Sequence, residues 1–236
     1  MNLPDSITIV TGASRGIGLA LSRALIERGG KVAGFARDRE RLDEVAAELG
    51  DAFFPVVCPV GDLEAVQSAI RQTHEKFGRI DALVNNAGIG HFGAVDELGK
   101  AEWDEMISTN ITGVFHCIRE VVPILKAQGG GHIINIASIA GRVGNPNLSG
   151  DNASKVAVQG LSDALFQELR NDGIKVTAIY PGSVQTSFSS IRKRSPTKNK
   201  LTPEEVAETI IHCLERSDNY LIDTIVLRPL QPNKEK

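Results

Sequence analysis

The sequence has few cysteines, no run of apolar residues long enough to cross a membrane, and no excess of basic residues. Its three cysteines, Cys58, Cys117 and Cys213, are far apart and odd in number, which argues against a disulfide framework or a cysteine metal centre. We expect reduced, mostly buried thiols in a reducing compartment, and no metal. The net charge of −3 gives no reason to expect nucleic acid or an anionic membrane as a partner.

A membrane-spanning helix needs roughly 18 consecutive apolar residues, and no segment of this sequence approaches that length. The first residues lead directly into an apolar segment with no basic region before it, so no signal peptide is predicted. We therefore expect a cytoplasmic protein. With 236 residues, 42% of them hydrophobic, the chain can form the core of one domain spanning 1–236.

Short apolar segments rich in β-branched residues alternate with longer segments of helical period. The predicted strands are 6–11, 31–35, 52–57, 80–85, 132–137, 175–179 and 221–227. The predicted helices are 16–28, 38–49, 63–77, 100–128, 153–171 and 203–216. Continuous apolar strands joined through helices are typical of a parallel sheet covered on both faces. The pattern predicts a Rossmann-type, doubly wound α/β domain with a seven-stranded parallel sheet and helices on both faces.

One polar segment, 187–200, interrupts this pattern and contains several lysines and arginines. It follows the carboxyl end of a predicted strand, which is the end where open α/β sheets bind ligands. We expect a lid beside the ligand cleft, with a solvated surface loop as the alternative.

A glycine-rich turn, TGASRGIG from Thr11 to Gly18, follows the first predicted strand and opens the first predicted helix. Glycines allow a tight turn and let backbone N–H groups approach a pyrophosphate, and the helix N-terminus adds partial positive charge. In this strand-to-helix context the turn predicts a dinucleotide site.

The end of the second strand decides which dinucleotide is bound, because an acidic residue there would hold the ribose 2′-hydroxyl. This strand ends in Ala36-Arg37 instead. Arg37, together with Arg15, can form charge-assisted bonds to a 2′-phosphate. NADP(H) is therefore favoured and NAD(H) is not excluded. The alternative is that Arg37 is a solvated residue at a helix start, beside Asp38 as the N-cap.

Further motifs follow in a fixed order, and they are listed here from the N-terminus: Asn85-Asn86-Ala87-Gly88 after the fourth strand, Asn110 in STNITG, Ser138 at the end of the fifth strand, Lys155 in NASKVAV, and Pro181-Gly182 with Val184 and Thr186. Together with TGASRGIG, these motifs resemble those of the short-chain dehydrogenase/reductase family. The resemblance extends over essentially the whole chain.

This resemblance implies an oxidoreductase that transfers a hydride between a nicotinamide and a small carbonyl or alcohol substrate. It implies cofactor contacts from Gly12, Ser14, Arg15, Gly16, Ile17, Gly18, Arg37, Val60, Asn86, Ala87, Gly88, Lys155, Pro181, Gly182, Val184 and Thr186. It places the catalytic positions at Asn110, Ser138, Asp151 and Lys155.

Two positions depart from the family's pattern. The family has its catalytic tyrosine four residues before the lysine, where this sequence has Asp151. The two tyrosines of the chain, Tyr180 and Tyr220, lie elsewhere. The third strand is followed by Pro59-Val60, where the family commonly has an aspartate-valine pair near the adenine. That aspartate contact is therefore not expected here.

An aspartate is a poor substitute for a phenol as proton donor. Its side chain is shorter, and its ordinary pKa of about 3.9 should be lowered further by a neighbouring ammonium such as that of Lys155. At neutral pH we expect an anion that pairs with Lys155 and has no proton to donate. The loss of a positioned general acid costs about 100- to 10,000-fold in rate.

Three interpretations stay open. The chain is an NADP(H)-dependent oxidoreductase whose activity is impaired or atypical because of Asp151. Alternatively, another group supplies the proton, either Tyr180 or a water ordered by Ser138. In the third interpretation the chain is a non-catalytic NADP(H)-binding pseudoenzyme with a regulatory or interaction role. The retained Asn110, Ser138 and Lys155 favour the first two.

We expect His91, Phe92, residues 143–147 and residues 187–200 to line the substrate pocket. The family resemblance also implies that long helices such as 103–125 and 153–169 pair across a two-fold axis. A homodimer is therefore predicted, with a tetramer as the alternative.

Overall fold

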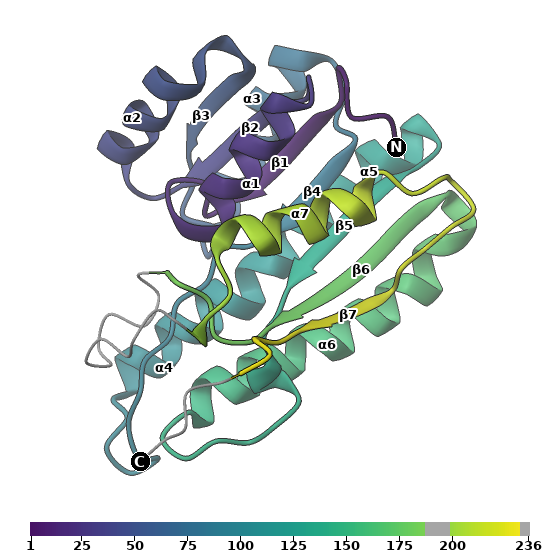
Figure 1. The fold of residues 1–236 in the computed structure, drawn as a ribbon. Coiled ribbons are helices and arrows are strands. Elements are labelled where there is room, and N and C mark those ends of the chain that lie inside the picture. The colour runs from purple at the N-terminus through teal and green to yellow at the C-terminus, as the bar shows by residue number, and fades with distance from the viewer. Residues whose placement is uncertain (187–198, 232–236) are drawn as a thin grey trace.

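The computed structural model describes residues 1–186 and 199–231, in which a central sheet lies between two layers of helices (Figure 1). The strands are β1 (Ile7–Thr11), β2 (Lys31–Ala36), β3 (Phe53–Val57), β4 (Ala82–Asn85), β5 (Gly131–Ile136), β6 (Ile174–Pro181) and β7 (Thr224–Leu227). All neighbouring strands are parallel, in the order β3-β2-β1-β4-β5-β6-β7. The chain returns from the β3 edge to place β4 beside β1, which confirms the predicted doubly wound topology.

Helices cover both faces of the sheet, as predicted. One face packs against α1 (Gly16–Glu27), α2 (Arg39–Leu49) and α7 (Pro203–Leu214), and the other against α3 (Leu63–Phe77), α5 (Gly113–Gln128) and α6 (Ser149–Leu169). Successive strand residues alternate between the layers: Ile9 belongs to the α3, α5 and α6 side, and Val10 to the other. Both faces therefore need apolar residues, which explains the continuous apolar strands of the sequence.

Helices α1 and α7 pack against each other although they lie near opposite ends of the chain. Arg28, the C-cap residue that follows α1, pairs with Glu208 of α7 at 2.8 Å across 180 positions of sequence. The amine of Met1 donates a hydrogen bond of 2.6 Å to the carbonyl oxygen of Leu214, the last residue of α7. The N-terminal half of the fold is thus completed by a C-terminal helix.

Two predicted helices have different boundaries in the structure. The predicted helix 100–128 is divided into α4 (Lys100–Ile107), a π-helical turn η2 (Ser108–Thr112) and α5. The second, predicted from 153, begins at Ser149, so that Asp151 lies in the first turn of α6. Gly150 and its neighbours are weak helix formers, but Gly150 is packed closely against Met106 of α4, and such tertiary packing overrides propensity.

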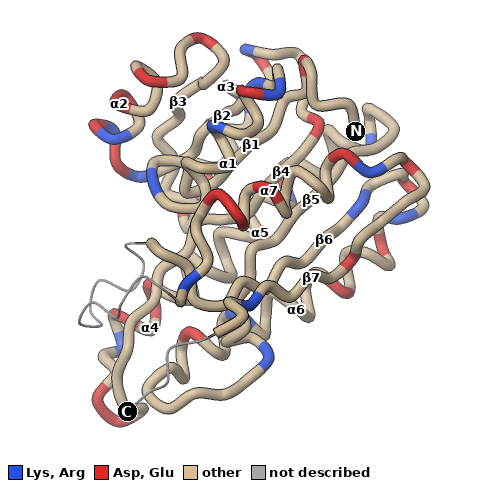
Figure 2. The backbone as a smooth tube through the Cα atoms, viewed as in Figure 1, with Lys and Arg blue, Asp and Glu red and all other residues tan. Residues whose placement is uncertain are grey.

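Short 3₁₀ segments complete the described fold: η1 (Gly50–Ala52), η3 (Ile139–Gly141) and η4 (Arg170–Asp172). The last strand begins at Thr224 rather than at the predicted 221. Acidic and basic residues are interspersed over the elements (Figure 2). Within residues 1–186 and 199–231, no helix is long and apolar enough to cross a membrane.

The three cysteines are free and buried, as predicted. Burial raises the pKa of the Cys58 thiol to about 12 and that of Cys213 to about 11. These thiols are therefore protonated and unreactive at neutral pH.

Candidate functional site

A cavity of about 2350 Å³ lies at the carboxyl ends of the strands. Its lining includes residues that follow each of the strands from β1 to β6, which is the place where α/β sheets of this topology bind ligands. Pockets for small ligands usually measure about 300–1,000 Å³. The cavity is therefore large enough for a dinucleotide together with a second, smaller molecule.

The turn between β1 and α1 is shaped by three glycines. Gly12 and Gly16 have φ angles of 67° and 56°, which favour glycine. A Cβ atom on Gly18 would lie 2.3 Å from the carbonyl oxygen of Gly12, so only glycine fits there. The Thr11 hydroxyl fixes the neighbouring segment, because its oxygen accepts hydrogen bonds of 2.9 Å from the backbone N–H groups of Asn86 and Ala87.

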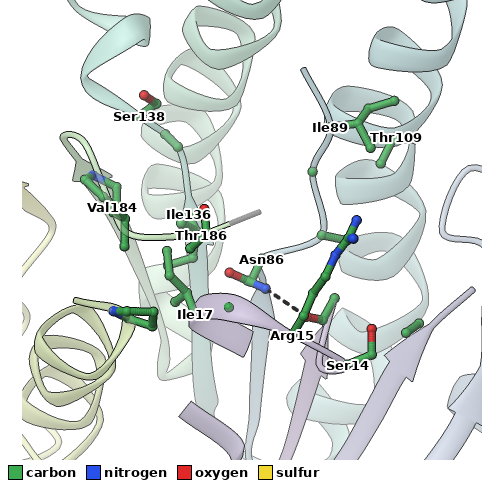
Figure 3. A pocket seen from close by; sticks show the side chains of 18 of the residues that line it. Ser14, Arg15, Ile17, Asn86, Ile89, Thr109, Ile136, Ser138, Val184 and Thr186 are labelled. Carbon is green, nitrogen blue, oxygen red and sulfur yellow. Dashed lines mark hydrogen bonds between the residues drawn. The ribbon is translucent and has the colours of Figure 1, made fainter. Parts of the chain in front are cut away.

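The N-terminus of α1 opens into this cavity. Helix α1 begins at Gly16, and the side chain of its N-cap residue, Arg15, makes no capping hydrogen bond, so the first N–H groups of the helix can donate to an anionic ligand. The side chain of Arg15 extends from the turn toward Ile89 and Thr109 (Figure 3). At the end of β2, Arg37 adds a second cation to the cavity wall.

Arg37 is hydrogen-bonded to Glu105 of α4, which lines the same cavity. Its Nη1 atom lies 3.2 Å from Oε1 of Glu105, and the other carboxylate oxygen lies 2.9 Å from Nε2 of His91. These hydrogen bonds, first from His91 and then from Arg37, lower the pKa of the Glu105 carboxyl. Sequence analysis did not identify Glu105, because it is 68 positions from Arg37 and belongs to no motif.

This arrangement corrects the predicted substrate pocket. His91 lies against α4, and neither His91 nor Phe92 lines the cavity within the part of the chain that the structure describes. Of the predicted segment 143–147, Asn145 lines it. Most of the predicted lid, 187–198, lies outside the described residues, and Asn199 and Lys200 line the cavity.

The remaining predicted site residues that line the cavity are Gly12, Ser14, Arg15, Gly16, Ile17, Arg37, Val60, Asn86, Ala87, Gly88, Ser138, Asp151, Lys155, Pro181, Gly182, Val184 and Thr186. They come from both halves of the chain. The structure therefore brings the glycine-rich turn and three of the four predicted catalytic positions, Ser138, Asp151 and Lys155, to one cavity.

Two predicted site residues lie behind the cavity wall. Gly18 packs beneath Gly12, and Asn110 is buried in the π-helical turn. The Asn110 amide accepts a bond of 3.0 Å from the N–H of Ile89 and donates bonds of 2.9 Å to the Ile89 carbonyl and 3.0 Å to the Ser154 hydroxyl. It thereby joins η2, the segment after β4 and α6.

Ser138, Asp151 and Lys155 form the other end of the cavity. The Ser138 oxygen accepts a hydrogen bond of 3.1 Å from the N–H of Ala140. Asp151 is 5% exposed and Lys155 is 7% exposed. Burial raises the pKa of the Asp151 carboxyl, opposed by the charge of Lys155, and burial lowers the pKa of Lys155. The predicted lowering of the Asp151 pKa was therefore wrong in direction, because desolvation outweighs the neighbouring charge.

The predicted ion pair between Asp151 and Lys155 is not formed. Among the described residues, none makes a hydrogen bond or ion pair to the Asp151 carboxyl group, and its buried Oδ1 atom has no partner. A buried polar atom without a hydrogen-bond partner costs about 1–3 kcal/mol of folding free energy, so Asp151 destabilises the folded chain when no ligand is bound.

Tyr180, the suggested substitute proton donor, is 1% exposed and does not belong to the described cavity lining. Its ring lies 5.1 Å from the guanidinium carbon of Arg142. Burial raises the pKa of its phenol, which makes proton release harder. Tyr180 therefore acts as a core residue in this structure.

Comparisons with known proteins agree with this geometry. Residues 6–196 match the family described as short chain dehydrogenase. An uncharacterized oxidoreductase of Staphylococcus saprophyticus is 38% identical over 234 residues, covering 98% of this chain and 100% of that protein. The closed form of serine dehydrogenase complexed with NADP⁺ superposes with a TM-score of 0.91 at 31% identity, covering 98% of both chains. A 3-ketoacyl-(acyl-carrier-protein) reductase from Brucella melitensis complexed with NADH has a TM-score of 0.91 at 29% identity, covering 97% of this chain and 98% of that one.

Proposed function

Because this chain belongs to the short-chain dehydrogenase family, we propose that it is an NADP(H)-dependent oxidoreductase acting on a small carbonyl or alcohol substrate. The observation that supports this most directly is the single cavity that joins the glycine-rich turn to Ser138 and Lys155. One end suits a dinucleotide and the other suits a reacting carbonyl carbon. When bound, the nicotinamide supplies or accepts the hydride.

The residues at the first end fit a phosphorylated dinucleotide. Cβ atoms at Gly12 and Gly16 would intrude at the turn, 3.0 Å from Ala87 and 3.2 Å from Thr186. Without them, the backbone can approach a pyrophosphate, and the first N–H groups of α1, which the Arg15 side chain does not cap, can donate to it. Arg37 and Arg15 supply cations for a 2′-phosphate.

At the other end, the Ser138 hydroxyl can donate its proton to the substrate oxygen, because its hydrogen bond with Ala140 uses the oxygen as acceptor. Lys155 places a buried nitrogen in the same wall. Asp151 occupies the position at which the family has its proton donor, and an ionised carboxyl group there has no proton to give to the substrate oxygen. We therefore propose that carbonyl reduction is slow in this chain.

Consumption of NADPH and NADH over a panel of aldehydes, ketones and quinones tests the function, with binding of both cofactors measured by calorimetry. Turnover of a panel member supports an oxidoreductase. Tight NADPH binding without turnover, both by this chain and by Asp151→Tyr, would favour the cofactor-binding pseudoenzyme over the oxidoreductase. Failure to bind NADPH and NADH would reject both of these functions.

Arg37→Ala should weaken NADPH binding by about 10- to 100-fold, the effect of losing a charge-assisted hydrogen bond, and should leave NADH binding nearly unchanged. Calorimetric titration with the two reduced cofactors measures the difference. Arg39→Ala is the matched control, because Arg39 is exposed on α2 and does not line the described cavity. Equal weakening of NADPH and NADH by Arg37→Ala would contradict selection by the 2′-phosphate.

Glu105→Gln should strengthen NADPH binding by about two- to fivefold, with little effect on NADH. The carboxylate of Glu105 competes for Arg37 and would repel a 2′-phosphate, but both side chains are about half exposed, so the pair contributes only about 0–1 kcal/mol. Titration with 2′-AMP and 5′-AMP isolates the effect on the phosphate. Weaker binding of 2′-AMP would show instead that Glu105 is needed to orient Arg37.

A further inference from the structure

Among the charged groups that line the described cavity, the carboxyl group of Asp151 has a buried oxygen without a hydrogen-bond partner. The residue is 5% exposed, it lines the cavity beside Ser138 and Lys155, and its Oδ1 atom has no hydrogen-bond partner in the described structure. Buried polar atoms without partners are rare in native proteins, and a catalytic role or a bound molecule is one explanation for them. What this group lacks is a hydrogen-bond donor.

The reaction that needs no acid at this position is hydride transfer to a carbon–nitrogen double bond. A ketone oxygen becomes negatively charged as the hydride arrives and requires a proton, which an ionised carboxyl group does not carry. A protonated imine already carries its proton, and its positive charge disappears during the transfer. Such a cation is stabilised by a nearby carboxylate, and its N–H group is a donor.

We propose that the cavity accepts a substrate with a protonated nitrogen on the reacting carbon. The substrate is an iminium ion and the product is the corresponding amine. The Asp151 carboxylate accepts a hydrogen bond from the N–H group of this nitrogen. The proposal rests on the proposed nicotinamide chemistry. A reduced nicotinamide dinucleotide is the reductant: a C–H bond forms at the imine carbon, and the π pair of the C=N bond becomes the nitrogen lone pair. No proton is added in this step, and the amine afterwards takes one from water.

The neighbouring charges are compatible with a cationic ligand. Lys155 lies one helical turn from Asp151, but it makes no bond to the carboxyl group among the described residues, so it does not occupy the acceptor. Burial lowers the pKa of Lys155. A bound ammonium or iminium group would also stabilise the ionised form of Asp151, which burial disfavours.

Binding of amines and of their matched alcohols tests the proposal without relying on turnover. The full chain, with and without NADP⁺, is titrated by calorimetry with isopropylamine, cyclohexylamine and benzylamine, and with isopropanol, cyclohexanol and benzyl alcohol. We expect at least one amine to bind more tightly than its alcohol. Asp151→Asn, which keeps the size of the side chain but removes its charge, should weaken the binding of that amine about 10- to 100-fold. The affinity for the matched alcohol should stay unchanged.

Asp163→Asn provides the matched control, since Asp163 is exposed on the same helix. It should leave amine binding unchanged. Circular dichroism and NADPH titration establish that each variant is folded. Equal binding of amines and alcohols, no binding of either, or no effect of Asp151→Asn would overturn the proposal.

A second comparison separates this proposal from the proposed function. The cyclic imines 1-pyrroline and 3,4-dihydroisoquinoline are offered with NADPH alongside cyclopentanone and 1-tetralone. Faster reduction of the imines, lost in Asp151→Asn, supports the iminium substrate. Reduction of the ketones alone would uphold the oxidoreductase and reject the iminium proposal. Failure to bind NADPH would reject the proposed function itself, while amine binding to Asp151 would still be measured independently.

Discussion

Asp151→Tyr should raise the rate of NADPH-dependent carbonyl reduction by about 100- to 10,000-fold, the usual contribution of a positioned general acid. Asp151 lines the cavity, so a phenol at this position can extend into space that a carboxyl group leaves open. Lys155, one turn later on α6, would lower the pKa of that phenol. Initial rates of NADPH consumption with the aldehyde and ketone panel measure the gain.

Asp163→Tyr is the control for this gain, because it adds the same side chain to an exposed position of the same helix. Its carbonyl reduction should equal that of the unchanged chain. A gain in Asp151→Tyr would show that the rest of the site is a working reductase. Equal rates in all three chains would mean that a different group donates the proton.

Gly18→Ala should abolish measurable dinucleotide binding and lower the free energy of unfolding by about 1–3 kcal/mol, as overpacking of a buried site does. The added methyl group would lie 2.3 Å from the Gly12 carbonyl oxygen and 2.7 Å from Nδ2 of Asn86. Backbone cannot yield as a flexible side chain can, so the whole turn after β1 must shift. NADPH calorimetry and urea denaturation measure the two effects.

Gly160→Ala is the matched control, because a Cβ atom at this exposed position of α6 meets nothing within 4 Å. Its NADPH affinity should be unchanged. Unaltered NADPH affinity in Gly18→Ala would show that the turn tolerates displacement and that its geometry does not determine dinucleotide binding.

Much of this fold could be predicted from the sequence because its local signals agree with one another. Apolar strands such as β1 and β5 are buried on both faces, so their composition and their partners point to the same parallel sheet. The start of α6 at Ser149 could not be predicted, since it depends on the packing of Gly150 against α4. The π-helical turn around Asn110 likewise depends on hydrogen bonds to Ile89 and Ser154.

The candidate site was predictable where it follows motifs and unpredictable where it depends on desolvation or on distant contacts. Charge alone suggested a lowered pKa for Asp151 and an ion pair with Lys155, whereas burial raises that pKa and the pair is not formed. Glu105 could be assigned only once α4 was placed opposite Arg37. The homodimer and the cytoplasmic location stay predictions.

The contact between α1 and α7 has a consequence for synthesis on the ribosome. The apolar side of α1 is buried partly against α7, and Arg28 and Glu208 meet across 180 positions. The half of the fold that contains the glycine-rich turn is therefore complete in sequence long before it can be complete in structure. While the rest of the chain is being made, at about 5–20 residues per second, this surface stays uncovered and available to chaperones. A nascent chain that stops before α7 should expose it permanently.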